Sequence, residues 1–487
     1  MIPRVTRDPL RLRPDPRRVI TKLFVPGEEV PEHESRAAGV IRRVMALDED
    51  TVLAALERTV RLFAGRHRDV RVTFADNFAS VSHRLAADAD LSESRRLLIG
   101  AYFTHEYAVE GAALCNPSVV AHPDQAGTAP GELRFVLSVR GIGEGHVSSV
   151  GFRTGLAGPG AALTVDPQPS IISTGARTEA VYEKSLFLGT LAERGHDDEV
   201  SAVLTRWLPS RFTGAELDEL LAGLHPKLVA RQAAHRTIEL IRWIAACNYT
   251  TEFPDDSVVS GRVLWPSGPS ERHGMEDARF VRFTDDDGEQ TYYATYTAYD
   301  GVDVAPQLLQ TNDFRTFRVT QTTGSAARNK GMALFPRRIG GRFVALSRGD
   351  GESTAVTTSG DIRTWDEARP VARPARDWEL VQVGNCGSPI ETPEGWLVLT
   401  HGVGPMRLYS MGAMLLDLDE PHRVLASLPE PLLTPSSAER DGYVPNVVYS
   451  CGGLLHDDTL VIPYGASDAT IGLATAPIGD LLAAMVR

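Results

Sequence analysis

The sequence predicts a mainly β protein, a five-bladed β-propeller with an N-terminal helical extension and a helical insertion. Glycine (43 residues) and proline (31 residues) together make up about 15% of the chain, which favours many turns. Short segments of strand-forming residues, bounded by turn residues, recur through most of the sequence. These segments group into five units, and the last three have about the length of one propeller blade, roughly 40–50 residues.

The composition argues against several other classes of protein. Lys and Arg number 50 against 63 Asp and Glu, so the net charge is −13 and a nucleic-acid-binding surface is not expected. No stretch approaches the ~18 apolar residues of a membrane span, and the N-terminus has no apolar core for a secretory signal. The cysteines form no CxxC pair, so we expect reduced thiols in a cytoplasmic protein.

Residues 1–110 are predicted to form an extended arm followed by helices. The arm, roughly the first 30 residues, is rich in Arg and Pro. Apolar residues then recur at helical spacing from Asp48 to about Arg66, with Asp48 as a cap, and again from Ser92 to about Val109.

Residues 111–487 are predicted to form the β domain, with residues 197–247 as its helical insertion. A weak internal repeat supports repeated blades, because Phe314–Phe317 and Ile362–Trp365 match in residue type at a spacing of 48 residues. The alternative is a β-sandwich followed by separate α/β pieces. The predicted β units are residues 112–190, 258–318, 328–367, 379–426 and 440–485.

The segment His273–Phe283 has the highest density of residues that could act in catalysis or ligand binding. Glu276 and Asp277 are adjacent, and Arg279 follows just before a strand. Because neighbouring side chains on a strand point to opposite faces, both carboxylates can enter one site only if the backbone bends there. We expect one of them to act as a ligand or acid, while a solvated turn with a surface ion pair is the alternative.

Other strand ends carry polar residues at similar places. Lys330 and Arg348 are separated by a strand, a Gly-Gly turn and a return strand, so hairpin closure can bring the two cations together as an anion site. Glu391 and His401 flank another hairpin, so we expect both to point into one depression. Inner strands of a propeller converge on a central depression. The last unit adds polar residues at Glu439, Tyr443, Asn446 and Asp468.

Several well-known motifs are missing. The Gly141–Gly145 run lies between two strands, so it is not expected to bind a dinucleotide. There is no GxSxG, HExxH or P-loop sequence, and the histidines have no metal-ligand spacing. We expect neither a metal nor an organic cofactor.

The β domain resembles glycoside hydrolase family 130, the β-mannoside phosphorylases and β-mannosidases. The resemblance implies a five-bladed propeller and an inverting attack on a β-mannoside, and the N-terminal helices and insertion are similar to those of longer, oligomeric members. A homo-oligomer is therefore expected. The motifs that carry it are Cys115–Ser118, Gly274–Arg279, Tyr296–Gly301, Leu334–Pro336, Glu391–Trp396, Gly412–Asp417, Gly442–Val448 and Tyr464–Asp468.

The resemblance also implies roles for particular residues. Asp277 matches the family's acid, which protonates the leaving oxygen through the 3-hydroxyl of mannose, although Ala278 replaces the usual proline. Lys330 and Arg348 match two of the family's phosphate-binding positions. The residues expected to contact the sugar are Asn116, Arg279, Tyr299, Asp300, His401, Tyr443, Asn446 and Asp468.

One position departs from the family pattern. The third phosphate-binding cation, usually Lys, aligns with Glu391. A carboxylate there would repel phosphate and could activate water instead. An inverting hydrolase needs a base ~6.5–9.5 Å from the acid, and Glu391 and Glu439 are the candidates.

Three functions follow from this resemblance. The leading hypothesis is hydrolysis of β-mannosides, in particular β-1,2-linked manno-oligosaccharides, from the non-reducing end. The alternative is phosphorolysis to α-mannose 1-phosphate, with inorganic phosphate as co-substrate and Lys330, Arg348 and His401 as the anion site. The third is a non-catalytic carbohydrate-binding propeller, against which the retention of Asp277 argues.

Overall fold

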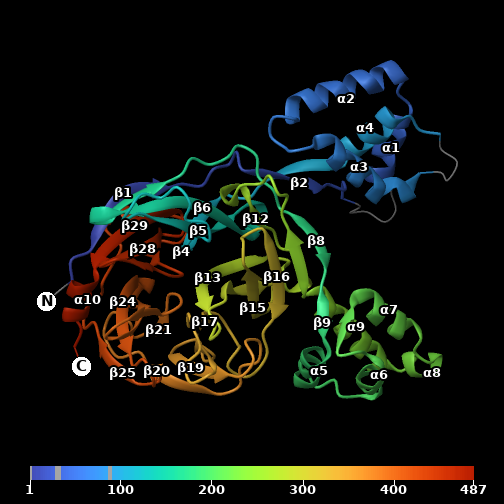
Figure 1. Ribbon diagram of the computed structural model, residues 1–487. Helices are drawn as coiled ribbons and strands as arrows, with labels where there is room; N and C mark the ends of the chain where they lie inside the picture. Colours follow the sequence, from blue (N-terminus) through green and yellow to red (C-terminus); the bar gives the residue numbers. More distant parts are fainter. Residues whose placement is uncertain (1–2, 28–34, 86–89, 487) are drawn as a thin grey trace.

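The computed structural model describes residues 3–27, 35–85 and 90–486. In this part of the chain β-strands dominate, and most of them form four larger sheets arranged around a common centre (Figure 1). The predicted mainly β fold class is therefore confirmed. Two groups of helices lie outside the ring of sheets (Figure 1).

The largest sheet contains two antiparallel groups of strands. A single parallel pair, Gly274 with Ser148, connects them, so the two groups are joined by strand pairing only at that point. The first group consists of β4 (Ala113–Ala121), β5 (Leu133–Ile142), β6 (Ser148–Gly158), β7 (Ala162–Val165) and β12 (Val263–Leu264). The second consists of β13 (Gly274–Thr284), β14 (Gln290–Tyr299), β15 (Val304–Thr311), β16 (Thr316–Gln321), β11 (Tyr249–Glu252) and β8 (Ala176–Glu179).

The other three large sheets follow in chain order. One consists of β17 (Ala333–Leu334), β18 (Phe343–Ser347), β19 (Thr354–Ser359) and β20 (Ala368–Ala372). The next consists of β21 (Gln382–Asn385), β22 (Ile390–Thr392), β23 (Gly395–Val403), β24 (Tyr409–Leu416) and β25 (Val424–Ser427). The last consists of β26 (Val448–Tyr449), β27 (Leu454–His456), β28 (Thr459–Ala466), β29 (Thr470–Pro477) and, from the other end of the chain, β1 (Thr6–Leu12).

Part of the predicted N-terminal arm belongs to the last sheet. Strand β1 pairs antiparallel with β29, next to the C-terminal helix α10 (Ile478–Ala483). Glu439 strengthens this junction, because its buried carboxylate lies 3.3 Å from Arg7 Nε and 3.2 Å from Arg11 Nη2. Tyr464 also donates a hydrogen bond to Glu439 at 2.6 Å. The beginning and the end of the chain are thus tied together in one sheet.

The N-terminal helices form a separate group with its own apolar core. Their caps follow the sequence: Asp48 accepts from the backbone N–H of Thr51, and Ser92 from that of Arg95. The group consists of α1 (Arg36–Met45), α2 (Glu49–Phe63), α3 (Val70–Val81) and α4 (Glu93–Tyr102).

The helix predicted from Ser92 to Val109 is shorter than expected. It ends at Tyr102, and Thr104–Ala108 form strand β3, which pairs with β2 (Val19–Leu23). Tyr107 is buried in that two-stranded sheet rather than on a helix face. A partner strand about 85 residues earlier in the chain, which helical periodicity does not detect, decides the structure here.

The insertion is also longer than its predicted range. Its first helix begins at Lys184, ahead of the expected residues 197–247, and the group has its own buried core. The helices are α5 (Lys184–Glu193), α6 (Glu199–Trp207), α7 (Gly214–Ala222), α8 (Pro226–Val229) and α9 (Gln232–Ala246). A two-stranded antiparallel sheet of β9 (Val181–Glu183) and β10 (Arg211–Thr213) belongs to the same insertion.

Two further sequence-based expectations concern membrane spans and the state of the cysteines. Among the described residues, no helix combines the length and apolar character needed to cross a bilayer. All four cysteines are buried and unbridged, as expected for reduced thiols: they are Cys115, Cys247, Cys386 and Cys451.

The ion cluster around Glu439 gives a stability prediction. We expect Glu439→Gln to lower the free energy of unfolding at pH 7 by roughly 1–3 kcal/mol, because a buried charge-assisted network loses its acceptor. Burial raises the pKa of Glu439, but the hydrogen bonds from Tyr464 and Ser436 and the charge of Arg7 outweigh burial and hold the pKa below its usual value. A lowered pKa stabilises the fold above the unfolded-state value and loses this effect as the pH falls.

Urea unfolding at pH 7 and at pH 3.5 measures both parts of this prediction. The difference between wild type and Glu439→Gln should be large at pH 7 and small at pH 3.5. The exposed pair of Glu391 with Arg337 provides the control, and Glu391→Gln should cost less than about 1 kcal/mol. Equal effects of the two substitutions at pH 7 would show that the Glu439 cluster does not hold the junction.

Candidate active site

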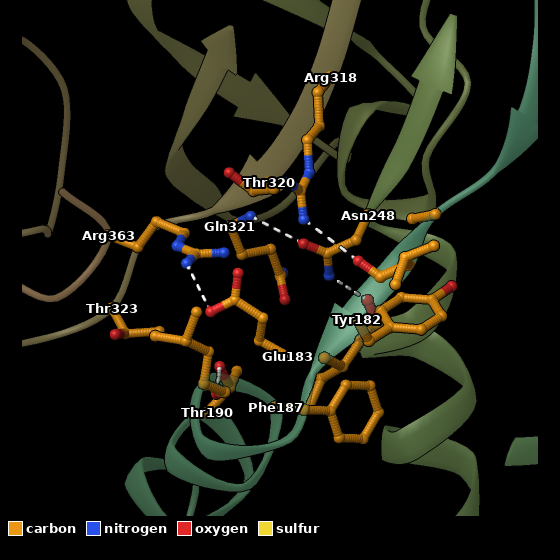
Figure 2. A pocket seen from close by; sticks show the side chains of 14 residues that line it. Tyr182, Glu183, Phe187, Thr190, Asn248, Arg318, Thr320, Gln321, Thr323 and Arg363 are labelled. Carbon is orange, nitrogen blue, oxygen red and sulfur yellow. Dashed lines mark hydrogen bonds and ion pairs between the residues drawn. The ribbon is translucent and has the colours of Figure 1, made fainter. Parts of the chain in front are cut away.

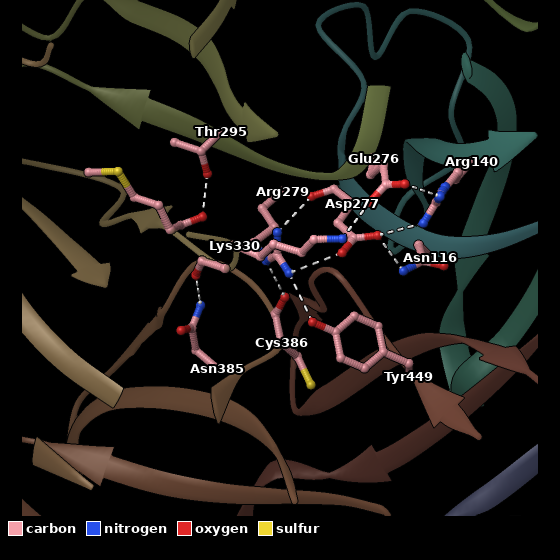
Figure 3. Close-up of polar contacts among 12 residues, drawn as sticks. Asn116, Arg140, Glu276, Asp277, Arg279, Thr295, Lys330, Asn385, Cys386 and Tyr449 are labelled. Carbon is pink, nitrogen blue, oxygen red and sulfur yellow. Dashed lines mark hydrogen bonds and ion pairs between the residues drawn. The ribbon is translucent and has the colours of Figure 1, made fainter. Parts of the chain in front are cut away.

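A polar pocket opens where several sheets converge. It encloses about 340 Å³ and draws its lining from strands and loops that lie far apart in the sequence. Figure 3 shows its buried carboxylates and the side chains that contact them. The lining residues are Asn116, Arg140, Asp277, Asn329, Lys330, Arg348, Gly351, Gln382, His401, Arg407, Tyr409, Val444, Val447, Tyr449 and Asp468.

Asp277 lines this pocket, and the adjacent Glu276 contacts Arg140 and Lys330 of the lining, because β13 is bulged. The pairing register of β13 with β14 shifts between Glu276 and Arg279, and Asp277 has a φ of 55°. A bulge re-aims a side chain that regular pleating would send to the opposite face. Arg140 contacts both carboxylates, donating to Glu276 Oε1 at 2.5 Å and to Asp277 Oδ1 at 3.3 Å.

Asn116 occupies a similar bulge on the neighbouring strand. The register of β4 with β5 shifts between Cys115 and Ser118, and Asn116 has a φ of 48°. Its Nδ2 donates to Asp277 Oδ1 at 2.6 Å, while its buried Oδ1 has no protein partner. Asn116 therefore fixes Asp277 and keeps one acceptor for a ligand hydroxyl.

Arg279 supports the loop from beneath. Its guanidinium donates to the backbone oxygen of Asp277 at 2.8 Å, to the backbone oxygen of Cys386 at 3.0 Å and to the hydroxyl of Tyr449 at 2.9 Å. Figure 3 shows these contacts joining β13 to two other sheets. Arg279 is 1% exposed and does not line the pocket, so it positions Asp277 and is not a direct sugar ligand.

The two pocket aspartates differ in their electrostatic environment. Burial acts to raise the pKa of Asp277, but the charges of Arg140, Arg279 and Lys330 outweigh burial and lower it below its usual value. Burial raises the pKa of Asp468 to about 6; the Asp277 charge adds to this rise and Arg140 opposes it. Asp277 is therefore the more acidic of the two in the empty pocket.

The opposite wall of the pocket is basic. Lys330 Nζ lies 2.7 Å from Glu276 Oε2, and Arg348 has no carboxylate within 4.0 Å among the described residues. Burial, together with the charges of Arg348 and Arg279, holds the pKa of His401 well below its usual value, so this imidazole is neutral. Gly384 allows the close approach of Arg348 and His401, since a Cβ there would lie 2.4 and 2.5 Å from their side chains.

The structure separates Glu391 from the pocket, contrary to the sequence interpretation. In the β22–β23 hairpin, Glu391 pairs with Trp396, which lies five residues before His401 and hence roughly 16 Å away along the strand. The Glu391 carboxylate instead binds Arg337, with its nearest contact at 2.7 Å, beside a different cavity. Its proposed role as a base is not supported by this geometry.

Glu439, the other candidate base, also lies outside the pocket. Its carboxylate is 4% exposed; its oxygens accept from Arg11, Tyr464 and the backbone of Ser436, and one of them forms an ion pair with Arg7. A carboxylate with these contacts cannot approach a sugar or activate water. Glu439 caps the short turn that precedes the loop 440–447 and anchors the N-terminal strand.

The remaining expected sugar ligands divide into two groups. Tyr299 and Asp300 do not line the pocket, because the Tyr299 hydroxyl donates to Gly301 and Asp300 accepts from Val302 and Asp303 in a tight turn. Both were expected to contact the sugar, and both are instead occupied within this turn.

Tyr443 and Asn446 lie on the loop that borders the pocket. Neither lines it, although the loop contributes Val444 and Val447 to the lining. The 43% exposed Tyr443 bonds to His146, and Asn446 accepts from Arg440 at 2.8 Å.

Sequence reasoning did not single out several pocket residues. Arg140 ends a strand and Arg407 follows a turn, and arginines at such places are usually on the surface. Left-handed backbone is a shared feature that sequence can suggest for Asn and Asp but not for Arg. The non-glycine lining residues with positive φ are Asn116, Asp277, Asn329, Arg407 and Asp468.

A second cavity, beside the helical insertion, is too small to be an alternative site (Figure 2). Arg363 binds Glu183 there at 3.0 Å, and Arg318 donates to the backbone of Val181 at 3.1 Å. Its volume of about 40 Å³ suits one or two water molecules and no sugar ring. Elsewhere in the described ranges, no three His, Cys, Asp or Glu side chains group as a metal site requires.

Comparisons with known proteins agree with a carbohydrate-active enzyme. Residues 257–487 match the family model described as β-1,4-mannooligosaccharide phosphorylase. A 1,2-β-oligomannan phosphorylase of Thermoanaerobacter sp. (strain X514) is 34% identical over 222 residues, 43% of this chain and 71% of the relative. The chain belongs to glycoside hydrolase family 130, which confirms the resemblance found in the sequence.

Other relatives match over similar lengths. A β-1,2-mannobiose phosphorylase of Listeria innocua is 33% identical, covering 45% of this chain and 62% of the relative. A β-1,4-mannooligosaccharide phosphorylase of Ruminococcus albus is 34% identical, covering 40% and 61%. The solved complex of the Listeria innocua enzyme with β-1,2-mannobiose aligns with a TM-score of 0.44 at 22% identity, covering 78% of this chain and 92% of that one.

The raised pKa of Asp468 gives a prediction on stability. Because burial disfavours its charged form, the fold is destabilised above the unfolded-state pKa, and this penalty grows until the pH exceeds the folded value of about 6. We therefore expect Asp468→Asn to raise the melting temperature at pH 7.5.

Thermal unfolding of wild type and variant across pH 4 to 7.5 measures this effect. The gain should shrink steadily toward pH 4, where both forms are neutral. The exposed Asp441, on the loop beside the pocket, serves as control, and Asp441→Asn should leave the melting temperature unchanged at both ends of the range. A lower melting temperature for Asp468→Asn at pH 7.5 would contradict the electrostatic account.

Proposed function

We propose that the protein is an inverting β-mannoside phosphorylase. It cleaves β-1,2-linked manno-oligosaccharides from the non-reducing end and releases α-mannose 1-phosphate. The observation that carries this proposal is the composition of the pocket: the buried carboxylate Asp277 shares it with Lys330, Arg348 and the neutral His401, and neither Glu391 nor Glu439 lines it. Phosphorolysis thus replaces hydrolysis, our leading hypothesis from the sequence.

The relatives support the same choice. The matched proteins of Thermoanaerobacter, Listeria and Ruminococcus are all phosphorylases by name, and the first two act on β-1,2-linked substrates by name. The two glutamates that would serve a hydrolase lie outside the pocket, with Glu391 paired to Arg337 and Glu439 to Arg7 and Arg11.

The proposed reaction uses Asp277 as the acid. Protonated Asp277 gives its proton to the 3-hydroxyl of the bound mannose, and the hydroxyl proton passes to the leaving glycosidic oxygen. The bond from C1 to that oxygen breaks as a phosphate oxygen attacks C1 from the opposite face, which inverts the configuration. Hydrogen phosphate loses its proton on becoming the monoester, and this proton restores protonated Asp277.

Phosphate binding provides a reason for Asp277 to be protonated. In the empty pocket the neighbouring cations hold its pKa low. A phosphate dianion bound to Lys330 and Arg348 offsets their positive charge, and a nearby anion favours the neutral form of a carboxyl group. Asp277 therefore carries its proton only when phosphate, the nucleophile, is bound.

The remaining substrate contacts are assigned to residues that line the pocket. We assign the mannose hydroxyls to Asn116 and Asp468, and the phosphate to Lys330, Arg348 and the neutral His401. We also propose that the two groups of the largest sheet and the three other large sheets form five blades of a propeller. The N-terminal helices and the insertion lie outside it, and a homo-oligomer and a cytoplasmic location stay predictions.

Product analysis with β-1,2-mannobiose tests the proposed function. Incubation with inorganic phosphate should yield mannose and α-mannose 1-phosphate in equal amounts, identified by ³¹P and ¹H NMR, and omission of phosphate should abolish both. Mannose released at the same rate without phosphate would establish a hydrolase. The absence of any product from β-1,2- and β-1,4-mannosides would favour the non-catalytic binding propeller.

Substitution of the acid tests its role. Asp277→Asn should lower kcat by roughly 10²–10⁴-fold, because the amide cannot supply the proton. Glu391→Gln, at the exposed pair with Arg337, should change kcat by less than about threefold. Equal losses in the two variants, with both folded by circular dichroism, would return Glu391 to the catalytic machinery.

A further inference from the structure

The cations around the pocket divide into those with carboxylate partners and those without. Arg140 and Lys330 form ion pairs with Glu276, and Arg279 lies 3.9 Å from Asp277. Among the described residues, neither Arg348 nor Arg407 has a carboxylate within 4.0 Å, although both line the pocket. Neither of these two arginines forms a close ion pair in the described part of the chain, although the charge of Arg407 still acts on Asp468.

Arg407 enters the pocket from a constrained turn. It ends the short 3₁₀ turn Pro405–Arg407 between β23 and β24, and its φ of 56° follows a φ of 57° at Met406. Two successive non-glycine residues in the left-handed region each cost about 1–3 kcal/mol, and such strain persists only where the surroundings impose it. The turn leaves Met406 89% exposed while Arg407 lines the pocket.

A continuous row of side chains connects Arg407 to the phosphate wall. The Arg407 guanidinium lies 6.0 Å from the ring centroid of Tyr409. Tyr409 stacks on His401 with centroids 6.1 Å apart, and His401 adjoins Arg348 across Gly384. Arg407 therefore lies on the same side of the pocket as His401 and Arg348.

This part of the lining is suited to an oxyanion. The buried Nε–H of Arg348 has no protein partner, and Nδ1 of His401 is also unpaired. No hydrogen bond to a protein group is found for the Arg407 side chain within the described ranges. A phosphate presents several acceptor oxygens and up to two negative charges, and arginine is the side chain best adapted to bind it in a bidentate way.

We propose that Arg407 binds the phosphate co-substrate together with Arg348 and His401. This assignment rests on the proposed phosphorolysis and adds a third positive charge to those of Lys330 and Arg348 around the dianion.

Steady-state kinetics with β-1,2-mannobiose and inorganic phosphate test the proposal. Arg407→Gln should raise the KM for phosphate roughly 10- to 100-fold, as expected when a charge-assisted pair of hydrogen bonds is lost. The KM for β-1,2-mannobiose at saturating phosphate should stay within about twofold of wild type. Arg407→Lys, which keeps the charge but loses the planar fork, should lie between the two.

Arg423→Gln is the matched control. Arg423 is an exposed arginine on the same sheet, paired with Asp417 and distant in the hairpin from the pocket, so its loss should leave both KM values unchanged. Phosphate-induced stabilisation in thermal unfolding gives a second readout without turnover, and it should weaken in Arg407→Gln alone. This measurement also shows whether the variant is folded.

The outcomes separate this proposal from the function on which it rests. A wild-type enzyme that needs no phosphate would overturn the proposed phosphorolysis itself. A phosphate-dependent wild type with an unchanged phosphate KM in Arg407→Gln would overturn only the role of Arg407. A raised KM for mannobiose with an unchanged KM for phosphate would also overturn it, and would place Arg407 with Asp468 on the sugar side.

Discussion

The bulge on β13 is the constraint on which the site depends. A regular strand would send Glu276 and Asp277 to opposite faces, so the two carboxylates could not share one cation. With Asp277 in the left-handed region, both carboxylates reach Arg140, and Arg279 fixes the backbone oxygen of Asp277. The local backbone therefore determines where the acid lies and which cations set its charge.

In this arrangement the positively charged residues divide into two sets: those paired with carboxylates and those without such a pair. Arg140 and Arg279 are engaged with Asp277 and its neighbour, and they position the acid. Arg348 and Arg407 lack such partners among the described residues and are free to bind an anion. Lys330 lies between the two sets, since its ammonium contacts Glu276 and still has further protons to donate. In the proposed reaction, phosphate bound to these cations therefore changes the charge around Asp277 and favours its protonation.

The sequence predicted the parts of the site that lie in local motifs. Asn116, Asp277, Lys330, Arg348, His401 and Asp468 all line the pocket, as their motifs indicated. Periodicity also predicted the β-rich units and α2, whose cap at Asp48 forms as expected. These features depend on short stretches of chain, and short stretches are what sequence patterns describe.

The errors arose where distant segments decide the outcome. Glu391 was placed beside His401, but the hairpin register sets it against Trp396 and lets Arg337 bind it. Glu439 is engaged by Arg7 and Arg11, more than 400 residues earlier in the chain. Arg407 gave no signal because only its turn geometry brings it to the pocket. Neither strand register nor strand partners can be read from a single sequence.

A crystal structure with bound phosphate tests the central claim most directly. The account predicts an anion that contacts Arg348, His401 and Arg407, while Arg140 remains paired with Glu276 and Asp277. Phosphate seated on Arg140, with the bulge of β13 straightened or Asp277 turned out of the pocket, would contradict it.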